Sequence, residues 1–242
     1  RVHRRQRQMC IRDSYNNSSS LVIHINDNWV IFCLFSKTKL IDLNKVNFLH
    51  EKKSAFILKT IKKYLKSFSK KNTPIKVKLI YYNKSSALVP HYLFDDKNSL
   101  NYLKYNTRIQ INDLAANDLI LEDQINNVYI PYTDINNYIF EKFKAFDFYH
   151  YSSVLLEKLS NELTDNFSQK VFLNINNSFI DILYFKNKQL IFFNSFDYKS
   201  KEDILYYLLF TFSELSLNPD NIHLVCCGLI DLDSELYVLL YN

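Results

Sequence analysis

The chain of 242 residues contains a single glycine, Gly228. Phosphate-binding loops need glycine because their backbone must approach the ligand closely and adopt positive φ. This shortage excludes a Walker loop, a Rossmann dinucleotide fingerprint and a kinase glycine-rich loop. Collagen and glycine-rich linkers are excluded for the same reason.

Arginine is also scarce, since Arg108 is the only one after the first twelve residues, against 24 lysines. Without residues 1–14 the chain has 25 basic and 24 acidic side chains, so a formal charge of +5 falls to +1. We interpret residues 1–14 as a non-native or disordered leader that resembles a translated sequencing adapter on a metagenomic fragment. A basic nucleic-acid-binding arm and a targeting peptide are the alternatives. With the leader set aside, nucleic acid is not an expected partner.

Long apolar runs and metal-binding spacings are missing as well. No run approaches the ~20 residues of a membrane span, so no membrane partner is expected. The four cysteines follow neither Cys-x-x-Cys nor Cys/His spacing, so no metal site is expected. Cys226 and Cys227 are adjacent in a predicted strand and point to opposite faces, so they are not expected to bond to each other. Reduced thiols of this kind predict a cytoplasmic protein.

The body of the chain carries one internal repeat, at an offset of 150 residues. Each copy reads as strand, polar turn, strand, strand, helix and strand. The turns are Asn26-Asp27-Asn28 and Asn176-Asn177-Ser178, whose residues tolerate left-handed backbone and can replace glycine in a hairpin. The expected strands and helices are 21–25, 29–35, a strand from 40, 51–68 and 75–81 in the first copy, and 171–175, 179–185, a strand from 190, 201–215 and 222–227 in the second.

Further elements follow each copy. Short strands are expected near 87–89, 119–121 and 128–130, and helices at 97–105, 134–143, 153–163 and 233–241. Thr133 or Asp134 is the expected N-cap of the helix at 134–143, and Asp233 or Ser234 that of the helix at 233–241. We divide the chain into the leader 1–14, a first half 15–165 that includes a connecting helix, and a second half 166–242 that is truncated at its C-terminal end.

This plan of three antiparallel strands, a helix and a strand, made twice, resembles that of the actin-like ATPase superfamily. Over about residues 19–242 the chain is similar to an uncharacterised family, chiefly from Bacteroidetes, that is a domain of unknown function with this fold. The resemblance is carried by residues 194–198, 201–207 and 225–228, with support from 88–90, 93–95, 102–106 and 150–153. It implies an α/β fold of two duplicated ribonuclease-H-like halves, with mixed sheets flanked by helices.

The resemblance also implies where a nucleotide would bind. Active members hold it between the halves, on Asp-x-Gly hairpins whose aspartates position Mg²⁺. Here the first hairpin has His24 at the Asp position, unless a shifted register makes Asp27 the acid, and the second has Asn174. No catalytic or metal-binding residue is assigned. The degenerate cleft loops comprise Asn26, Asp27, Asn28, Asn176, Asn177, Ser178 and Gly228, the last as the remnant of an adenosine loop.

Other constellations have a structural interpretation. Asp231, Asp233 and Glu235 mimic a calcium-ligand run but lack the glycine of an EF-hand loop, so helix-capping and solvated acids are the preferred interpretation. His150 beside Ser152 and Ser153 lacks a nucleophile elbow and is interpreted as a structural histidine at a helix start.

The sequence favours a catalytically degenerate protein, a pseudoenzyme that serves as a cytoplasmic scaffold or adaptor for an unidentified protein partner and uses no cofactor. The alternative is a nucleotide-binding ATPase or kinase-like switch of the same superfamily that uses ATP with Mg²⁺ in the cleft between the halves. A third hypothesis, an RNA-associated factor, requires a contiguous lysine face. The missing Asp-x-Gly motifs argue against an enzyme, and the nucleotide-binding protein is kept as the alternative.

Overall fold

The computed structural model describes residues 19–48, 50, 54–66, 76–163 and 169–241. The expected leader lies outside this range, as do both ends of the expected helix 51–68. The chain divides into two compact units, unit 1 up to Glu157 and unit 2 from Lys158. The expected division into halves at residue 165 stays a prediction.

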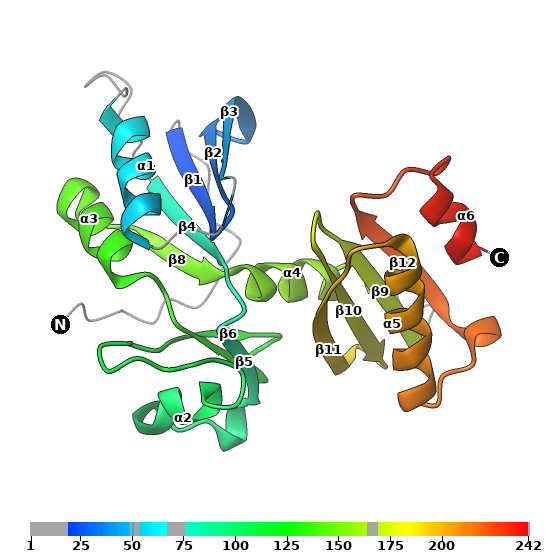
Figure 1. Ribbon diagram of the computed structural model, residues 1–242. Coiled ribbons are helices and arrows are strands. Elements are labelled where there is room, and N and C mark those ends of the chain that lie inside the picture. The colour runs from blue at the N-terminus through cyan, green and yellow to red at the C-terminus, as the bar shows by residue number, and fades with distance from the viewer. Residues whose placement is uncertain (1–18, 49, 51–53, 67–75, 164–168, 242) are drawn as a thin grey trace. The chain divides into compact units, whose positions relative to one another are not determined.

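Unit 1 is built on a five-stranded sheet of order β3-β2-β1-β4-β8 (Figure 1). Antiparallel pairing joins β1 to β2 and β2 to β3, whereas β4 and β8 add in parallel. Its elements are β1 (Ser19–Asn26), β2 (Trp29–Ser36), β3 (Lys39–Asn47), α1 (Ser54–Lys66), β4 (Lys76–Tyr82), α3 (Thr133–Phe143), β8 (Asp147–His150) and the start of α4 (Tyr151–Ser160).

The core of unit 1 lies between this sheet and two helices. Helix α1 buries Ile57, Ile61 and Leu65, which recur at the four-residue spacing that places side chains on one helical face. They pack with apolar residues of β1 and β2 and with Ile135 and Ile139 of α3. Burying each such side chain stabilises the fold by roughly 1.5–3 kcal/mol.

A segment of unit 1 that we call the insert, residues 83–132, separates β4 from α3. It forms a three-stranded antiparallel sheet of order β5-β7-β6. Val89, Leu103 and Val128 make a small core of its own. Its elements are β5 (Ser86–Pro90), the short turns η2 (His91–Leu93) and η3 (Asp96–Asn98), α2 (Ser99–Leu103), β6 (Ala116–Ile120) and β7 (Ile125–Tyr129).

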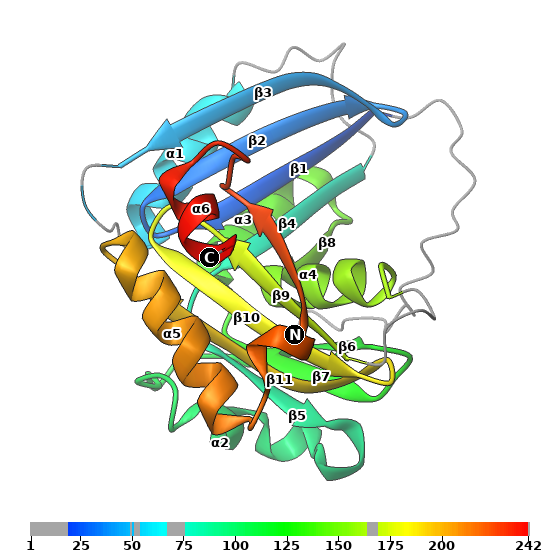
Figure 2. The same ribbon diagram turned by 90° about the vertical axis from the view of Figure 1, so that its right-hand side faces the viewer.

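Unit 2 holds a four-stranded sheet of order β11-β10-β9-β12, with α5 along one face (Figure 2). Ser200 caps α5 by accepting from the Asp203 backbone N–H, while the Asp203 carboxylate accepts from the Ser200 N–H. The elements are β9 (Gln169–Ile175), β10 (Phe179–Lys186), β11 (Gln189–Asp197), α5 (Lys201–Glu214), η4 (Pro219–Asn221), β12 (His223–Gly228) and α6 (Glu235–Tyr241).

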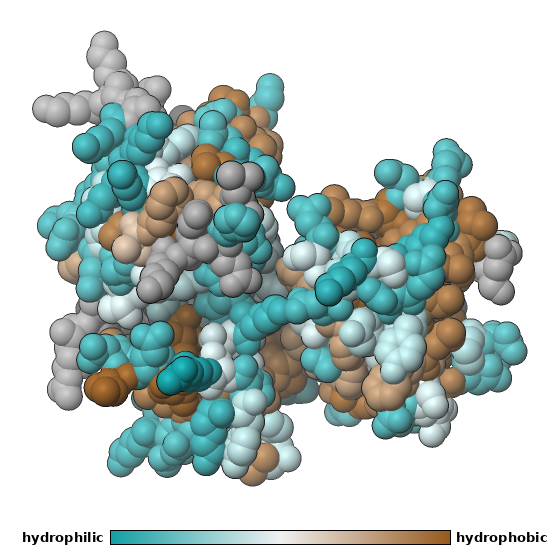
Figure 3. Space-filling view, in the orientation of Figure 1, coloured by the Kyte–Doolittle hydropathy of each residue, from teal (hydrophilic) through white to brown (hydrophobic). Residues whose placement is uncertain are grey.

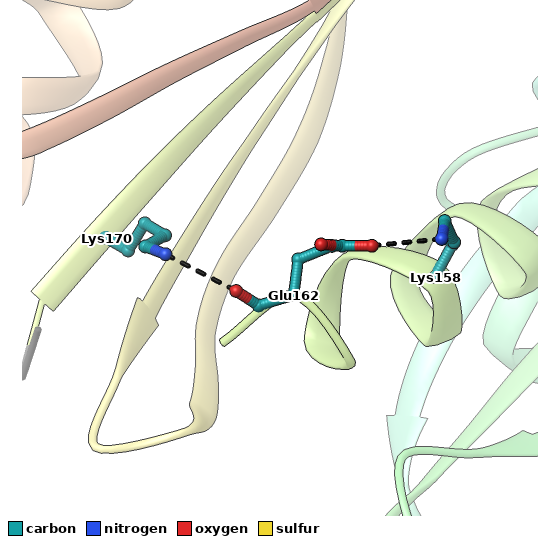
Figure 4. Close-up of polar contacts among 3 residues, drawn as sticks. All are labelled: Lys158, Glu162 and Lys170. Carbon is teal, nitrogen blue, oxygen red and sulfur yellow. Dashed lines mark hydrogen bonds and ion pairs between the residues drawn. The ribbon is translucent and has the colours of Figure 1, made fainter. Parts of the chain in front are cut away.

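Unit 2 begins at the C-terminal end of α4. There the Lys158 ammonium donates to Glu162 Oε1 at 2.9 Å, and both side chains are largely exposed. Lys170 of β9 approaches from the other side, and its Nζ lies 3.5 Å from the Glu162 carbonyl oxygen (Figure 4). Glu162 is thus contacted from both the helix and the sheet.

The internal repeat is present in the backbone at the level of single residues. Both copies run β-β-β-α-β with the same pairings. Each third strand carries one extra residue, Ile41 in β3 and Ile191 in β11, where the register shifts against the neighbouring strand. The carbonyl of Asn28 accepts from the Phe48 N–H at 2.7 Å, and the carbonyl of Ser178 accepts from Tyr198 at 3.2 Å.

Two expectations about local backbone were wrong. None of the six residues in the two polar turns has positive φ. Within the strand hairpins of the two copies, positive φ occurs instead at Lys37, Asn187 and Lys188, in the next turn. The first turn is instead held by the Asn26 side chain, whose Oδ1 accepts from the Asn28 N–H at 2.9 Å.

The second error concerns the start of α3. Neither Thr133 nor Asp134 is its N-cap; Tyr132 takes that position without a side-chain bond. The Asp134 carboxylate bonds the N–H of the next residue, Ile135, so it is already inside the helix. The cap of α6 was predicted correctly, since Ser234 Oγ accepts from the Tyr237 N–H at 3.1 Å.

Candidate functional site

The first hairpin of unit 1 brings Asn26, Asp27 and Asn28 together at the turn between β1 and β2. The Asn26 amide donates to the Tyr82 carbonyl at 3.0 Å, which ties the turn to the end of β4. The Asp27 carboxylate accepts a hydrogen bond from the Tyr132 hydroxyl, at the N-terminus of α3. The one acid of this turn is therefore engaged by a neighbour of the same unit.

An aromatic cluster lies against this hairpin. The Tyr82 ring stacks on Tyr151 with a centroid distance of 4.5 Å and meets Trp29 edge-on at 5.0 Å. The Tyr82 hydroxyl lies 3.2 Å from His24 Nδ1. Burial lowers the pKa of His24 to about 4, so the ring is neutral at physiological pH. His24 stands where the superfamily pattern has an aspartate, and it supplies no negative charge.

The second hairpin, in unit 2, carries Asn176, Asn177 and Ser178, and Gly228 pairs with Ile175, the last residue of β9 before this turn. The backbone of Gly228 has a φ of +85°, and a Cβ there would lie 2.2 Å from the Ile175 carbonyl oxygen. Only glycine fits so close an approach between β12 and β9. On the other side of the turn, the Tyr198 hydroxyl donates to the Asn176 carbonyl at 2.5 Å.

A row of polar side chains crosses the whole sheet of unit 2 just below this turn. Cys227, Asn174, Asp181 and Ser195 occupy directly paired positions on β12, β9, β10 and β11. Asn174 Nδ2 donates to Asp181 Oδ2 at 2.9 Å, and Ser195 Oγ donates to Asp181 Oδ1 at 2.5 Å. Cys227 Sγ lies 3.7 Å from Asn174 Oδ1. We call these four residues the polar row.

Asp181 is the acid at the centre of the polar row, and it has no exposed surface. A third donor, Asn176 Nδ2, lies 3.3 Å from its Oδ2. Burial raises the pKa of Asp181 to about 7, against the opposing effect of the Ser195 hydrogen bond. A carboxyl so enclosed does not fit a water-mediated Mg²⁺ contact, and Asn174, at the Asp position of this hairpin, carries no charge. No group of three or more potential metal ligands occurs among the described residues.

The structure thus gathers the predicted site residues into two sets, one in each unit, and the whole assignment stays a prediction. Sequence reasoning missed Asp181 and Ser195 as site residues. One signal pointed to each: Asp181 is the only acid in the apolar run of β10, and Ser195 lies in the stretch that carries the family resemblance.

His150, interpreted as structural, is buried at the junction of β8 and α4. Its Nε2 lies 2.9 Å from the Asn83 carbonyl and its Nδ1 lies 2.7 Å from Ser152 Oγ. Burial lowers the pKa of His150 to about 4. Asp118 accepts from the His150 N–H and from Ser153 Oγ, which joins β6 to the same junction. The cluster has no exposed face and holds the insert to the sheet.

Comparison with known proteins identifies the fold. The family described as "Protein of unknown function (DUF3822)" matches residues 12–242. A crystal structure from Bacteroides thetaiotaomicron VPI-5482, of a protein with actin-like ATPase fold and unknown function, covers 93% of this chain and 87% of its own, with a TM-score of 0.74 and 19% identity.

A second solved structure, described as the PilM-PilN type IV pilus biogenesis complex, matches with a TM-score of 0.52 and 11% identity over 94% of this chain and 85% of its own. No curated protein matches. The fold is therefore actin-like, as the sequence predicted. Among the described residues, no helix has both the length and the apolar character of a membrane span.

Proposed function

Since the chain belongs to the family described as a protein of unknown function, DUF3822, and has an actin-like ATPase fold, we propose that it is an adaptor that binds a protein partner and hydrolyses no nucleotide. In such an adaptor the two hairpins that bind nucleotide in other members of the superfamily keep their backbone shape. Their side chains pack within the fold and do not bind nucleotide.

The enclosure of Asp181 carries this proposal. Three side-chain donors surround the carboxyl, and its pKa of about 7 leaves it partly protonated at neutral pH. A magnesium-positioning acid must be ionised and open to water. In the second hairpin Asn174 stands at the Asp position, and Asp181, the acid paired with it, is fully buried, so neither residue meets both conditions. The first hairpin supports the same conclusion, because Asp27 is bonded to Tyr132 and the Tyr82 ring packs beside the turn.

Two features favour a protein partner: the fold and the exposed apolar side chains of the insert. One solved protein of similar fold is described as a complex of PilM with PilN, so this fold is compatible with a role in protein assembly. Unit 1 adds an insert of its own to the repeated elements, and the insert exposes several large apolar side chains. Exposed apolar side chains that gather in one patch mark interaction sites on proteins.

Calorimetric titration with Mg-ATP, Mg-ADP and Mg-GTP, together with a phosphate-release assay, tests the proposal. We expect no heat of binding at micromolar nucleotide and no turnover. Asp27→Ala is the diagnostic variant, and Asp220→Ala, an exposed acid in η4, is its control. Micromolar binding to the wild type, or turnover that only Asp27→Ala abolishes, would show that the protein is a nucleotide-dependent enzyme and not an adaptor of this kind.

A further inference from the structure

The insert contains a connection, residues 104–115, that we call the insert loop. It joins α2 to β6 and contains neither helix nor strand. Its length exceeds the ordinary connection of about 4–6 residues in compact domains. Connections of this length commonly carry a function of their own, and unit 2 holds no counterpart of the insert among its described residues.

Hydrogen bonds tie the insert loop to the start of β5 and close its own tip. Thr107 Oγ1 lies 2.9 Å from Ser85 Oγ, and the Asn106 amide donates to the Ser86 carbonyl at 3.0 Å. The tip closes on itself, since the Gln110 N–H donates to Asp113 Oδ2 at 2.7 Å and the Asp113 N–H to the Gln110 carbonyl at 3.1 Å. A loop that is ordered before binding loses little conformational entropy when a ligand arrives.

Apolar side chains of the insert loop point in two directions. Ile109 and Ala115 pack on the small core of the insert. Tyr105, Ile111 and Leu114 are 85%, 102% and 63% exposed. Figure 3 shows brown side chains among teal ones at the lower left of unit 1, where the insert lies. The inward residues anchor the loop, and the outward ones gain nothing for the fold by being apolar.

The charges of the insert loop are not balanced by partners. Lys104 and Arg108 are exposed, and neither has an acidic partner among the described residues. The Lys104 ammonium instead lies 5.1 Å from the Tyr105 ring. The only acid of the loop, Asp113, accepts from the backbone of the tip. Arg108 is also the single arginine after residue 12, and guanidinium binds carboxylates in a bidentate manner that lysine cannot match.

From this arrangement we propose that the insert loop is the docking surface for an acidic, apolar peptide segment of the protein partner. Arg108 binds a carboxylate of that segment, and Tyr105, Ile111 and Leu114 contact its apolar side chains. This inference rests on the proposed adaptor function and names the chemistry of the partner that the adaptor takes.

A random library of short peptides displayed on phage, selected against the immobilised full chain without nucleotide, provides the probe. We expect enriched peptides to combine Asp or Glu with aromatic or aliphatic residues. Synthetic copies of these peptides are then titrated by fluorescence anisotropy. Arg108→Ala and Ile111→Ser should each weaken binding at least about tenfold. Arg108→Lys should keep only part of the wild-type affinity, because lysine cannot make the bidentate contact.

Matched controls lie in unit 2, on exposed positions of the same type. Lys186→Ala and Ile191→Ser should leave the affinity unchanged within about twofold. Circular dichroism should show that all five variants fold, because every substituted side chain is exposed or largely so.

Three results would overturn the proposal: no enriched peptide, enrichment of basic peptides, or equal affinity for the insert-loop variants and the wild type. Sedimentation with phosphatidylserine vesicles is measured in parallel. Loop-dependent vesicle binding without peptide binding would assign the loop to an anionic membrane surface instead. Because nucleotide is absent throughout, a positive Mg-ATP titration would remove the adaptor proposal while a loop-dependent peptide affinity would still stand.

Discussion

The two units share the same order and pairing of strands, but they carry different side chains at corresponding positions. The polar row of unit 2 corresponds, strand by strand, to Ile80, His24, Ile31 and Lys45 in unit 1. Unit 2 buries an acid among hydrogen-bond donors there, and unit 1 places a half-buried histidine beside the Tyr82 ring. The hairpin backbone therefore does not dictate the chemistry at its base, and the two units should respond to pH in opposite directions.

The largest effect is expected from Gly228, whose counterpart in unit 1 is the large and fully buried Tyr81. Gly228→Ala puts a Cβ against the Ile175 carbonyl and strains a positive φ. We expect unit 2 to lose more than about 4 kcal/mol of unfolding free energy. Hydrogen exchange followed peptide by peptide should show β9 and β12 opening while β1 and β4 stay protected.

The neighbouring Cys227→Ala serves as the control for this change. It removes one weak contact with Asn174 and adds no atoms, so unit 2 should stay folded. Equal protection of β9 in Gly228→Ala and the wild type would mean that the close approach of β12 is not needed for the unit.

The next effect is the pH dependence of unit 2. The folded pKa of Asp181 lies above its unfolded value of 3.8, so the folded state binds more protons between the two values. Unit 2 should thus lose stability as pH rises from about 4 to about 7, by roughly 3 kcal/mol in total. Asp181→Asn should abolish this fall and be more stable than the wild type at pH 8, measured by urea denaturation.

Ser195→Ala is the control, because it keeps the carboxyl and removes only a donor that favours its charged form. The pH-dependent fall should remain in this variant. A wild type whose unit 2 gains stability between pH 4 and pH 7 would contradict the burial of an acid with a raised pKa.

Unit 1 should respond to acid instead. The pKa of His24 and that of His150 are both about 4 in the folded state, below the value of 6.5. The unfolded state binds more protons between these values, so unit 1 should lose stability as pH falls from 6.5 to 4. His24→Phe keeps the aromatic packing and should remove about 2 kcal/mol of this loss of unfolding free energy. Urea denaturation at pH 7 and pH 4.5 measures the difference.

Tyr82→Phe is the matched control for His24. It removes the hydroxyl near Nδ1 but leaves the titrating ring in place, so the acid-induced loss should persist. If His24→Phe retained the full loss, the acid sensitivity of unit 1 would belong to His150 alone.

The smallest effect is expected at the exposed ion pair of Lys158 and Glu162 (Figure 4). Lys158→Ala should change the unfolding free energy by less than about 0.5 kcal/mol, because solvent screens a helical pair spaced by four residues. The change should vanish in high salt. A larger effect in urea denaturation would mean that the start of unit 2 depends on this pair.

Much of the fold could be predicted from the sequence because its signals are local. The expected helix 51–68 contains α1, whose buried Ile57, Ile61 and Leu65 recur at helical spacing, and the repeat with its family resemblance predicted the actin-like fold that the comparison confirmed. The helix from 97 to 105 was predicted too long, since α2 covers only Ser99–Leu103 and the insert loop begins immediately after it. The cytoplasmic location and the adaptor role stay predictions.

The chemistry of the candidate site could not be predicted in the same way, because it depends on register. Asn174, Asp181 and Ser195 meet only because three strands pair at those residues, and a shift of one position would send Asp181 to the other face of the sheet. Tyr132 and Asp27 are 105 residues apart in the chain, and no local pattern connects them. The scarcity of glycine pointed to altered hairpins without showing which side chains had taken their place.

The extra residues Ile41 and Ile191 bear on how the outermost strands behave towards other chains. Each lies on the strand at the end of its sheet, where backbone groups would otherwise offer a straight template for aggregation. A bulge twists the strand, so an incoming strand can follow the hydrogen-bonding pattern on only one side of it. The duplicated irregularity therefore gives a chain rich in phenylalanine and tyrosine two built-in interruptions against growth into fibrils, at the cost of one residue in each copy.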